Sequence, residues 1–213
     1  MAGANLTTHL PIIECINKAN TTPFSNALPE KSGQTFASGT PLMLSSGGYV
    51  QAWDGSSLTP PTSGILGVSE SFGLNLGSDG SGAPVYPFGQ VTGTIATSTY
   101  GSVPNQPSGV NIALGTPVSE GRTLYVEPNA DNIFEAMFDN SNGTAAADWT
   151  PTVADIGKQY GMTKDSIGPF WYVDKNKTGA SACIQIVGIH PTDGYTLNAR
   201  VRFQFLPAIV QII

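Results

Sequence analysis

Glycine and proline recur so often in this chain that the backbone must turn frequently. The 213 residues include 25 Gly and 16 Pro, the residue types that most often end strands and helices and form turns. Apolar residues make up 40% of the chain, which is too high for a disordered protein. Short strands joined by frequent turns, with many Ser, Thr, Gly and Val residues, are typical of an all-β protein. We therefore expect an all-β fold with little helix.

The chain carries few charges. Charged residues make up 11% of it and the net charge is −6, whereas average domains are about 25% charged. No Lys or Arg occurs between Lys31 and Arg122. Binding to nucleic acid or to an anionic membrane surface requires clustered basic residues, so we expect neither partner. The chain also shows no basic, apolar leader and no apolar run of about 20 residues, which predicts a soluble protein made in the cytoplasm.

Three zones follow one another along the sequence. Residues 1–32 contain the apolar run LPIIECI and then little pattern, which predicts an extended N-terminal arm ordered by what it contacts. Residues 33–118 form a first β domain and residues 119–213 a second β-rich domain with an apolar tail. The strands predicted in these zones are 40–44, 49–53, 64–69, 85–88, 91–95, 110–114, 123–127, 133–138, 170–174, 182–189 and 197–206.

The last predicted strand has the clearest alternation. Val201, Phe203 and Phe205 share one face, and the residues between them, Arg200, Arg202 and Gln204, share the other. Near residue 150 the pair Thr150-Pro151 is typical of a helix start. We expect a short helical turn there that runs through Tyr160 and ends at Gly161.

The polar motifs do not add up to a catalytic or metal site. The turn Ser45–Gly48 precedes a strand pattern and has no lysine nearby, so it predicts a hairpin rather than a phosphate loop. His9 and His190 stand alone, and the two cysteines, Cys15 and Cys183, lie outside any metal-binding spacing, which favours free thiols. A Ser-His-Asp arrangement assembled in space stays open. We predict no catalytic residue, no metal and no cofactor.

The tryptophans have two interpretations. Trp53, Trp149 and Trp171 are aromatic surfaces of the kind that line sugar-binding grooves. Trp53 and Trp171 lie in apolar strand patterns, and this favours a role as core anchors.

The segment TPLMLSSGGYVQAWDGSSLTPPTSGILGVSES resembles the head decoration protein of phage lambda and its relatives over residues 40–69. The shared order is a TPLML strand, a hairpin, a strand ending in AWDG, a loop and a GILGV strand. The resemblance implies a small β-barrel or β-tulip-like domain in residues 33–118. It also implies homotrimers or other homo-oligomers bound to the major capsid protein of an expanded head. This chain is about twice as long as such a protein requires.

The resemblance implies a structural virion protein on the capsid exterior of a tailed phage, a head decoration or cement protein rather than an enzyme. Another virion role, such as a tail, fibre or host-binding component, stays open, as does a carbohydrate-active enzyme with paired carboxylates in a cleft. The arm role can be placed on residues 5–16 by position, and an apolar tail left in water would aggregate unless a neighbour or its own sheet covered it. We therefore expect partner contacts at both ends of the chain, namely Asn5, Leu6, Thr7, Thr8, Leu10, Pro11, Ile12, Ile13, Ile209, Val210, Ile212 and Ile213.

Overall fold

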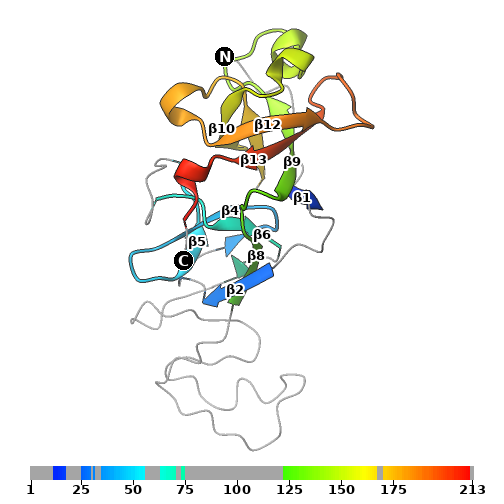
Figure 1. Ribbon diagram of the computed structural model, residues 1–213. Helices are drawn as coiled ribbons and strands as arrows, with labels where there is room; N and C mark the ends of the chain where they lie inside the picture. Colours follow the sequence, from blue (N-terminus) through cyan, green and yellow to red (C-terminus); the bar gives the residue numbers. More distant parts are fainter. Residues whose placement is uncertain are drawn as a thin grey trace, which may run out of the picture.

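The protein is all-β. The computed structural model describes residues 12–17, 25–29, 31, 35–55, 63–70, 73–74, 122–166 and 170–211, and Figure 1 shows them as two groups of strands, one above the other. Within these residues the helical elements are four 3-10 turns of three or four residues each, η2 (Ala146–Trp149), η3 (Val153–Asp155), η4 (Gly179–Ser181) and η5 (Pro207–Ile209). None of them has the length or the hydropathy of a membrane-spanning helix. The predicted all-β fold with little helix is confirmed.

The C-terminal group of strands closes into a five-stranded barrel. Its strands are β9 (Asn132–Asp139), β10 (Gln159–Lys164), β11 (Trp171–Asp174), β12 (Ile184–Ile189) and β13 (Arg200–Phe205). They pair in the order β9-β11-β10-β12-β13, and β13 returns to β9 to close the ring. The β9–β11 pair is parallel and the other four pairs are antiparallel.

The alternation predicted for the last strand directs its side chains as expected. In β13, Val201, Phe203 and Phe205 are buried inside the barrel, and Phe203 and Phe205 both contact the ring of Phe134 from β9. The alternating Arg200, Arg202 and Gln204 are only partly buried. A period of two therefore sets the inner and outer faces of the barrel wall.

The first group of strands is an open five-stranded sheet with the order β2-β8-β6-β4-β5. Its strands are β2 (Ser25–Pro29), β4 (Pro41–Leu44), β5 (Val50–Ala52), β6 (Gly67–Ser69) and β8 (Arg122–Val126). The short strands β3 (Thr35–Phe36) and β7 (Gly73–Leu74) form a separate pair. One face of the open sheet buries a small core made of Phe36, Leu42, Val50, Leu66 and Tyr125.

The turn at Ser45–Gly48 is a hairpin, as predicted. It joins β4 to β5, in which Leu44 lies opposite Val50. The backbone N–H of Ser45 donates to the carbonyl of Tyr49, and the Ser45 hydroxyl accepts from the Tyr49 N–H. Gly48 has a φ of +79°, a conformation that glycine adopts without steric cost.

The predicted helical turn near residue 150 is shorter and begins later than expected. It is the single turn η3, preceded by Thr152, whose N–H and hydroxyl both donate to the Asp155 carboxylate. Tyr160 lies in β10 instead, opposite Ile184. Because Asp155 satisfies the first turn locally and Tyr160 joins the barrel ladder, the helix does not extend.

Sheet membership crosses the boundaries expected from the sequence. Strand β8 lies beyond residue 118 but pairs with β2 and β6 of the open sheet. Strand β1 (Ile13–Asn17) lies in the predicted arm but pairs with β9 of the barrel. The chain passes from one sheet to the other in a turn where Asn129 Oδ1 accepts from the N–H groups of Asp131 and Asn132. The predicted strands 85–88, 91–95 and 110–114 lie outside the described residues.

A shared core joins the open sheet to the barrel. Met43, Trp53, Ile65 and Val68 belong to the same buried cluster as the inward-facing barrel residues. Trp53 stacks on Trp171 with 5.1 Å between ring centroids and 22° between planes. Both indoles are buried, so their role as core anchors is confirmed.

Candidate functional site

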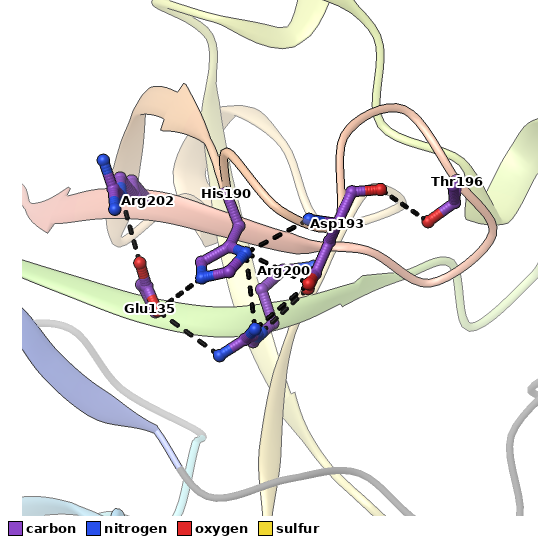
Figure 2. Close-up of polar contacts among 6 residues, drawn as sticks. All are labelled: Glu135, His190, Asp193, Thr196, Arg200 and Arg202. Atoms are coloured by element: carbon purple, nitrogen blue, oxygen red, sulfur yellow. Dashed lines mark hydrogen bonds and ion pairs between the residues drawn. The ribbon is translucent and has the colours of Figure 1, made fainter.

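The most extensive cluster of charged contacts described on the barrel lies on its outer wall (Figure 2). Glu135 comes from β9, Arg200 and Arg202 from β13, and His190 from the end of β12. The loop that joins β12 to β13 adds Asp193 and Thr196. Alternation places Glu135 and the arginines on the outer face, because their neighbours Phe134, Ala136, Val201 and Phe203 are buried inside.

Asp193 and Arg200 form a two-point ion pair within this cluster. Arg200 Nε lies 2.8 Å from Asp193 Oδ2, and its NH2 group lies 3.0 Å from Oδ1. The Arg200 backbone N–H also donates to Oδ2. The hydrogen bond from the Arg200 side chain, with the smaller backbone and charge effects, outweighs partial burial and lowers the pKa of Asp193 to about 2. The carboxylate is therefore ionised at neutral pH.

Glu135 is the most buried member of the cluster, and its side chain is only 4% exposed. Its Oε1 accepts from Arg202 Nε at 3.0 Å. Its Oε2 lies 3.6 Å from Arg200 NH1 and 3.7 Å from His190 Nε2. A buried carboxylate needs such partners, since a buried charge without them is costly.

The histidine is positioned by both carboxylates. His190 Nδ1 lies 3.0 Å from Asp193 Oδ1, while Nε2 faces Glu135. The nearby Thr196 hydroxyl donates to the carbonyl of Asp193, not to the imidazole. Within the residues drawn in Figure 2, the histidine therefore contacts acids and an arginine rather than a hydroxyl nucleophile. The described contacts hold the β12–β13 loop on the barrel.

A groove of about 500 Å³ lies between the start of β9, the ends of β12 and β13, and the C-terminal tail. Apolar groups such as Phe205, Leu206 and Val210 line it beside the amide side chains of Gln185 and Gln204. Glu127 brings a charge to the lining, and it accepts a hydrogen bond from Asn26. Gln204 donates to the carbonyl of Ala130. The groove has the size and mixed lining of a small binding site.

Several other acids are buried in the barrel and hydrogen-bonded there. Asp174 accepts from the Thr163 hydroxyl at 2.6 Å and from the N–H groups of Ser141 and Asn176. Asp155 accepts from the Tyr160 hydroxyl at 2.6 Å. Burial and this acceptor raise the pKa of Tyr160. In the described part of the chain, no three His, Cys, Asp or Glu side chains gather in a way that suits a metal ion.

The two cysteines differ in what is described of them. Cys183 is free and fully buried, and burial raises the pKa of its thiol to about 12. A thiol of this kind is protonated and unreactive at neutral pH. Cys15 lies in β1, and its side chain is outside the described set, as is His9.

The described residues predicted to contact partners are held by the chain itself. Ile12 and Ile209 are buried in the core shared by the two sheets, and Val210 packs against it. Ile65 donates through its N–H to the carbonyl of Ile209 and accepts from the N–H of Gln211. The tail up to Gln211 therefore pairs internally, which is one of the two alternatives left open by the sequence. The other predicted contact residues, Asn5, Leu6, Thr7, Thr8, Leu10, Pro11, Ile212 and Ile213, lie outside the described residues, and for Ile13 the structure gives the backbone pairing alone.

The sequence did not single out the charged cluster. The alternation of Arg200 and Arg202 with buried residues was visible, and so was a glutamate in the predicted strand 133–138. That β9 and β13 are neighbours, with Arg202 opposite Glu135, follows only from the closure of the barrel.

Comparisons with models of protein families, with curated proteins and with solved structures gave no match.

Proposed function

We propose that this protein is a structural component of a tailed-phage virion, a decoration or cement protein that binds the outer surface of the head and stabilises it through contacts with the coat protein. The proposal combines the resemblance of residues 40–69 with the physical character of the folded chain. Its partners would be the major capsid protein and further copies of itself.

One observation carries the proposal. The described parts of the segment 40–69 form one unit, in which β5, β4 and β6 are consecutive neighbours in the open sheet. Leu42, Val50 and Leu66 from this unit form most of the small core, while Met43, Trp53 and Val68 face the barrel. The segment that carries the resemblance is thus a folded module, and the barrel is a second module packed firmly on it.

This architecture suits a protein that reinforces a lattice. A cement protein gains affinity from apolar area buried against its neighbours, at roughly 25 cal/mol per Å² before ordering costs. Charges left unpaired in such contacts oppose binding. In the barrel the acids Glu135, Asp139, Asp155 and Asp174 are buried within the chain rather than displayed. The surface available for contacts therefore carries fewer acids than the composition suggests.

The direct test is co-sedimentation with expanded, undecorated heads of the source virus, followed by heating. Saturable binding that raises the temperature of head rupture is the expected result. Failure to bind both expanded and unexpanded heads would end the proposal.

Truncation tests the role of the N-terminal arm, and the structure sets where the cut must be made. Ile12 is 2% exposed and belongs to the shared core, so the deletion must stop at residue 11. Removal of residues 1–11 is expected to weaken head binding at least tenfold without changing the melting temperature of the free protein. Equal occupancy of heads by the truncated and full chains would exclude the arm as a capsid contact. Removal of residues 1–17 is the matched control, because it should lower the melting temperature as well.

A second candidate is a host-binding or tail role, favoured by apolar side chains exposed on the loops of the barrel. Val153 is 65% exposed and Tyr195 is 55% exposed. Binding of the protein to host cells or surface glycans, lost in a Tyr195→Ser variant and kept in a Val187→Ser variant, would favour this candidate over the capsid.

A further inference from the structure

The barrel leaves a gap along one edge of β9. On one edge β9 pairs with β13 through residues 134–137, and the N–H of Phe138 donates to Ala199 on that same side. On the other edge β11 pairs only with Phe138 and Asp139. The barrel itself therefore provides no partner for residues 132–135 on the β11 side. We refer to this edge, Asn132–Glu135, as the notch.

Strand β1 fills the notch. It runs antiparallel to β9, with Ile13 opposite Glu135, Ile16 opposite Ile133 and Asn17 opposite Asn132. A register shift between Glu14 and Ile16 accommodates the bulge. Asn132, Phe134 and Glu135 are each 3% exposed or less. Backbone groups at such a buried edge require hydrogen-bond partners, because each one left unsatisfied costs about 1–3 kcal/mol.

The strand in the notch is a separable element. It is the first described strand, and β9 is its single ladder partner among the described strands. Closure of the barrel does not depend on β1, because β9–β13 and β9–β11 pair independently of it. Ile12 adds an apolar anchor in the shared core. The chain therefore presents a preformed site for an extended apolar segment and carries a matching segment at its own end.

We propose that the notch is a strand-binding site for residues 12–17 of a second copy of this chain, so that copies join by exchanging their N-terminal strands. The matching segment is present in every copy at the same concentration as the notch. Exchange of an identical element between copies preserves every contact and is a low-cost route to an oligomer. Main-chain hydrogen bonds of this kind provide the affinity in strand addition.

Paired cysteines distinguish exchange from pairing within one chain. One full-length variant carries Cys15→Ser and Ile16→Cys, and a second, with a different tag, carries Cys15→Ser and Ile133→Cys. Residues directly opposite in an antiparallel pair have Cβ atoms about 4.5–5.5 Å apart, within reach of a disulfide after small adjustment. The two chains are unfolded, mixed, refolded together and oxidised. A covalent dimer carrying both tags is the expected product.

The control replaces Ile133→Cys with Lys164→Cys, an exposed position at the end of β10. This pair is expected to give at least tenfold less dimer. A chain carrying Ile16→Cys and Ile133→Cys together reports pairing within one chain. If it closes internally while the mixed variants form no dimer, strand exchange is wrong. If no cysteine pair closes, the pairing of β1 with the notch is itself wrong.

A peptide experiment guards against a cysteine variant that fails to fold. The full chain carrying Ile12→Asp is titrated with a labelled peptide of residues 10–18. Saturable binding is expected, with at least tenfold weaker binding of a peptide that itself carries Ile12→Asp. Equal binding of the two peptides would overturn the proposal. The result does not depend on heads, so the capsid function and strand exchange can fail separately.

Discussion

The barrel and the open sheet bury different kinds of polar group. The barrel buries carboxylates, and Glu135, Asp155 and Asp174 are each 3% exposed or less. In the described part of the open sheet, the buried polar side chains are the hydroxyls of Thr40, Ser69 and Thr123. A carboxylate is stable in the interior only when donors point at it, whereas a hydroxyl needs one partner. The barrel is therefore the region whose stability depends on precise polar geometry and on pH.

The largest expected effect tests whether the two regions differ in stability or unfold together. Phe203→Ala removes a ring that is fully buried in the barrel core and packs on Phe134 and Phe205. It should lower the free energy of unfolding by about 3–5 kcal/mol. Because Trp53 of the open-sheet module belongs to the same core cluster, urea unfolding should remain one transition by every probe. Val187→Ala, an exposed change on β12, should shift it by less than about 0.5 kcal/mol. Separate transitions for the two modules would contradict the shared core.

The next prediction compares the two kinds of buried polar group directly. Glu135→Gln removes the charge that faces Arg200 and Arg202 and should cost about 1.5–3 kcal/mol, the usual range for hydrogen bonds to charged groups. Thr40→Val removes a hydroxyl that donates to the carbonyl of Ala37. It should cost only about 0.5–1.5 kcal/mol, since the Ser69 hydroxyl also donates to that carbonyl. Urea unfolding of both variants measures the difference. Equal losses would show that the carboxylate is no more demanding than the hydroxyl.

What the sequence predicted follows the same division. Local patterns gave the hairpin at Ser45–Gly48, the alternation of β13 and the burial of Trp53 and Trp171, because each depends on neighbours along the chain. The closure of the barrel, and with it the charged cluster around Glu135, depends on which strands pair across long separations. Strand β8 shows the limit clearly. Its alternation predicted a strand, but the turn at Asn129, which separates it from the barrel strands, became evident only with the hydrogen bonds of that turn.

Acid should affect the barrel before the open sheet. Hydrogen bonds from Arg200 lower the pKa of Asp193 to about 2, while the unfolded value is about 3.9. A lowered folded pKa contributes stability above the unfolded pKa, and this contribution is lost as the pH falls from about 4 toward 2. The pKa of Asp155 is also lowered, because hydrogen bonds from Tyr160 and Thr152 outweigh the opposing effect of burial.

Amide hydrogen exchange between pH 5 and pH 2.5 checks this order. Protection in the β12–β13 loop, residues 190–199, should fall before protection in β4 and β6. In an Asp193→Asn variant the loop should be less protected at pH 5 and should lose little more on acidification. Simultaneous loss of protection in both regions would show that the pH dependence is not concentrated in the barrel.

The smallest expected effect is one that should not distinguish the regions. Gly48 in the open sheet and Gly157 beside β12 have φ angles of +79° and +85°, and an added Cβ would meet nothing within 4 Å at either position. Alanine at each should therefore cost only the strain of the left-handed backbone, about 1 kcal/mol. Equal shifts in urea unfolding would confirm that turn chemistry is the same in both regions. A larger cost at Gly157, whose N–H donates to the carbonyl of Ile186, would show that the barrel wall constrains its turns as tightly as it constrains its buried carboxylates.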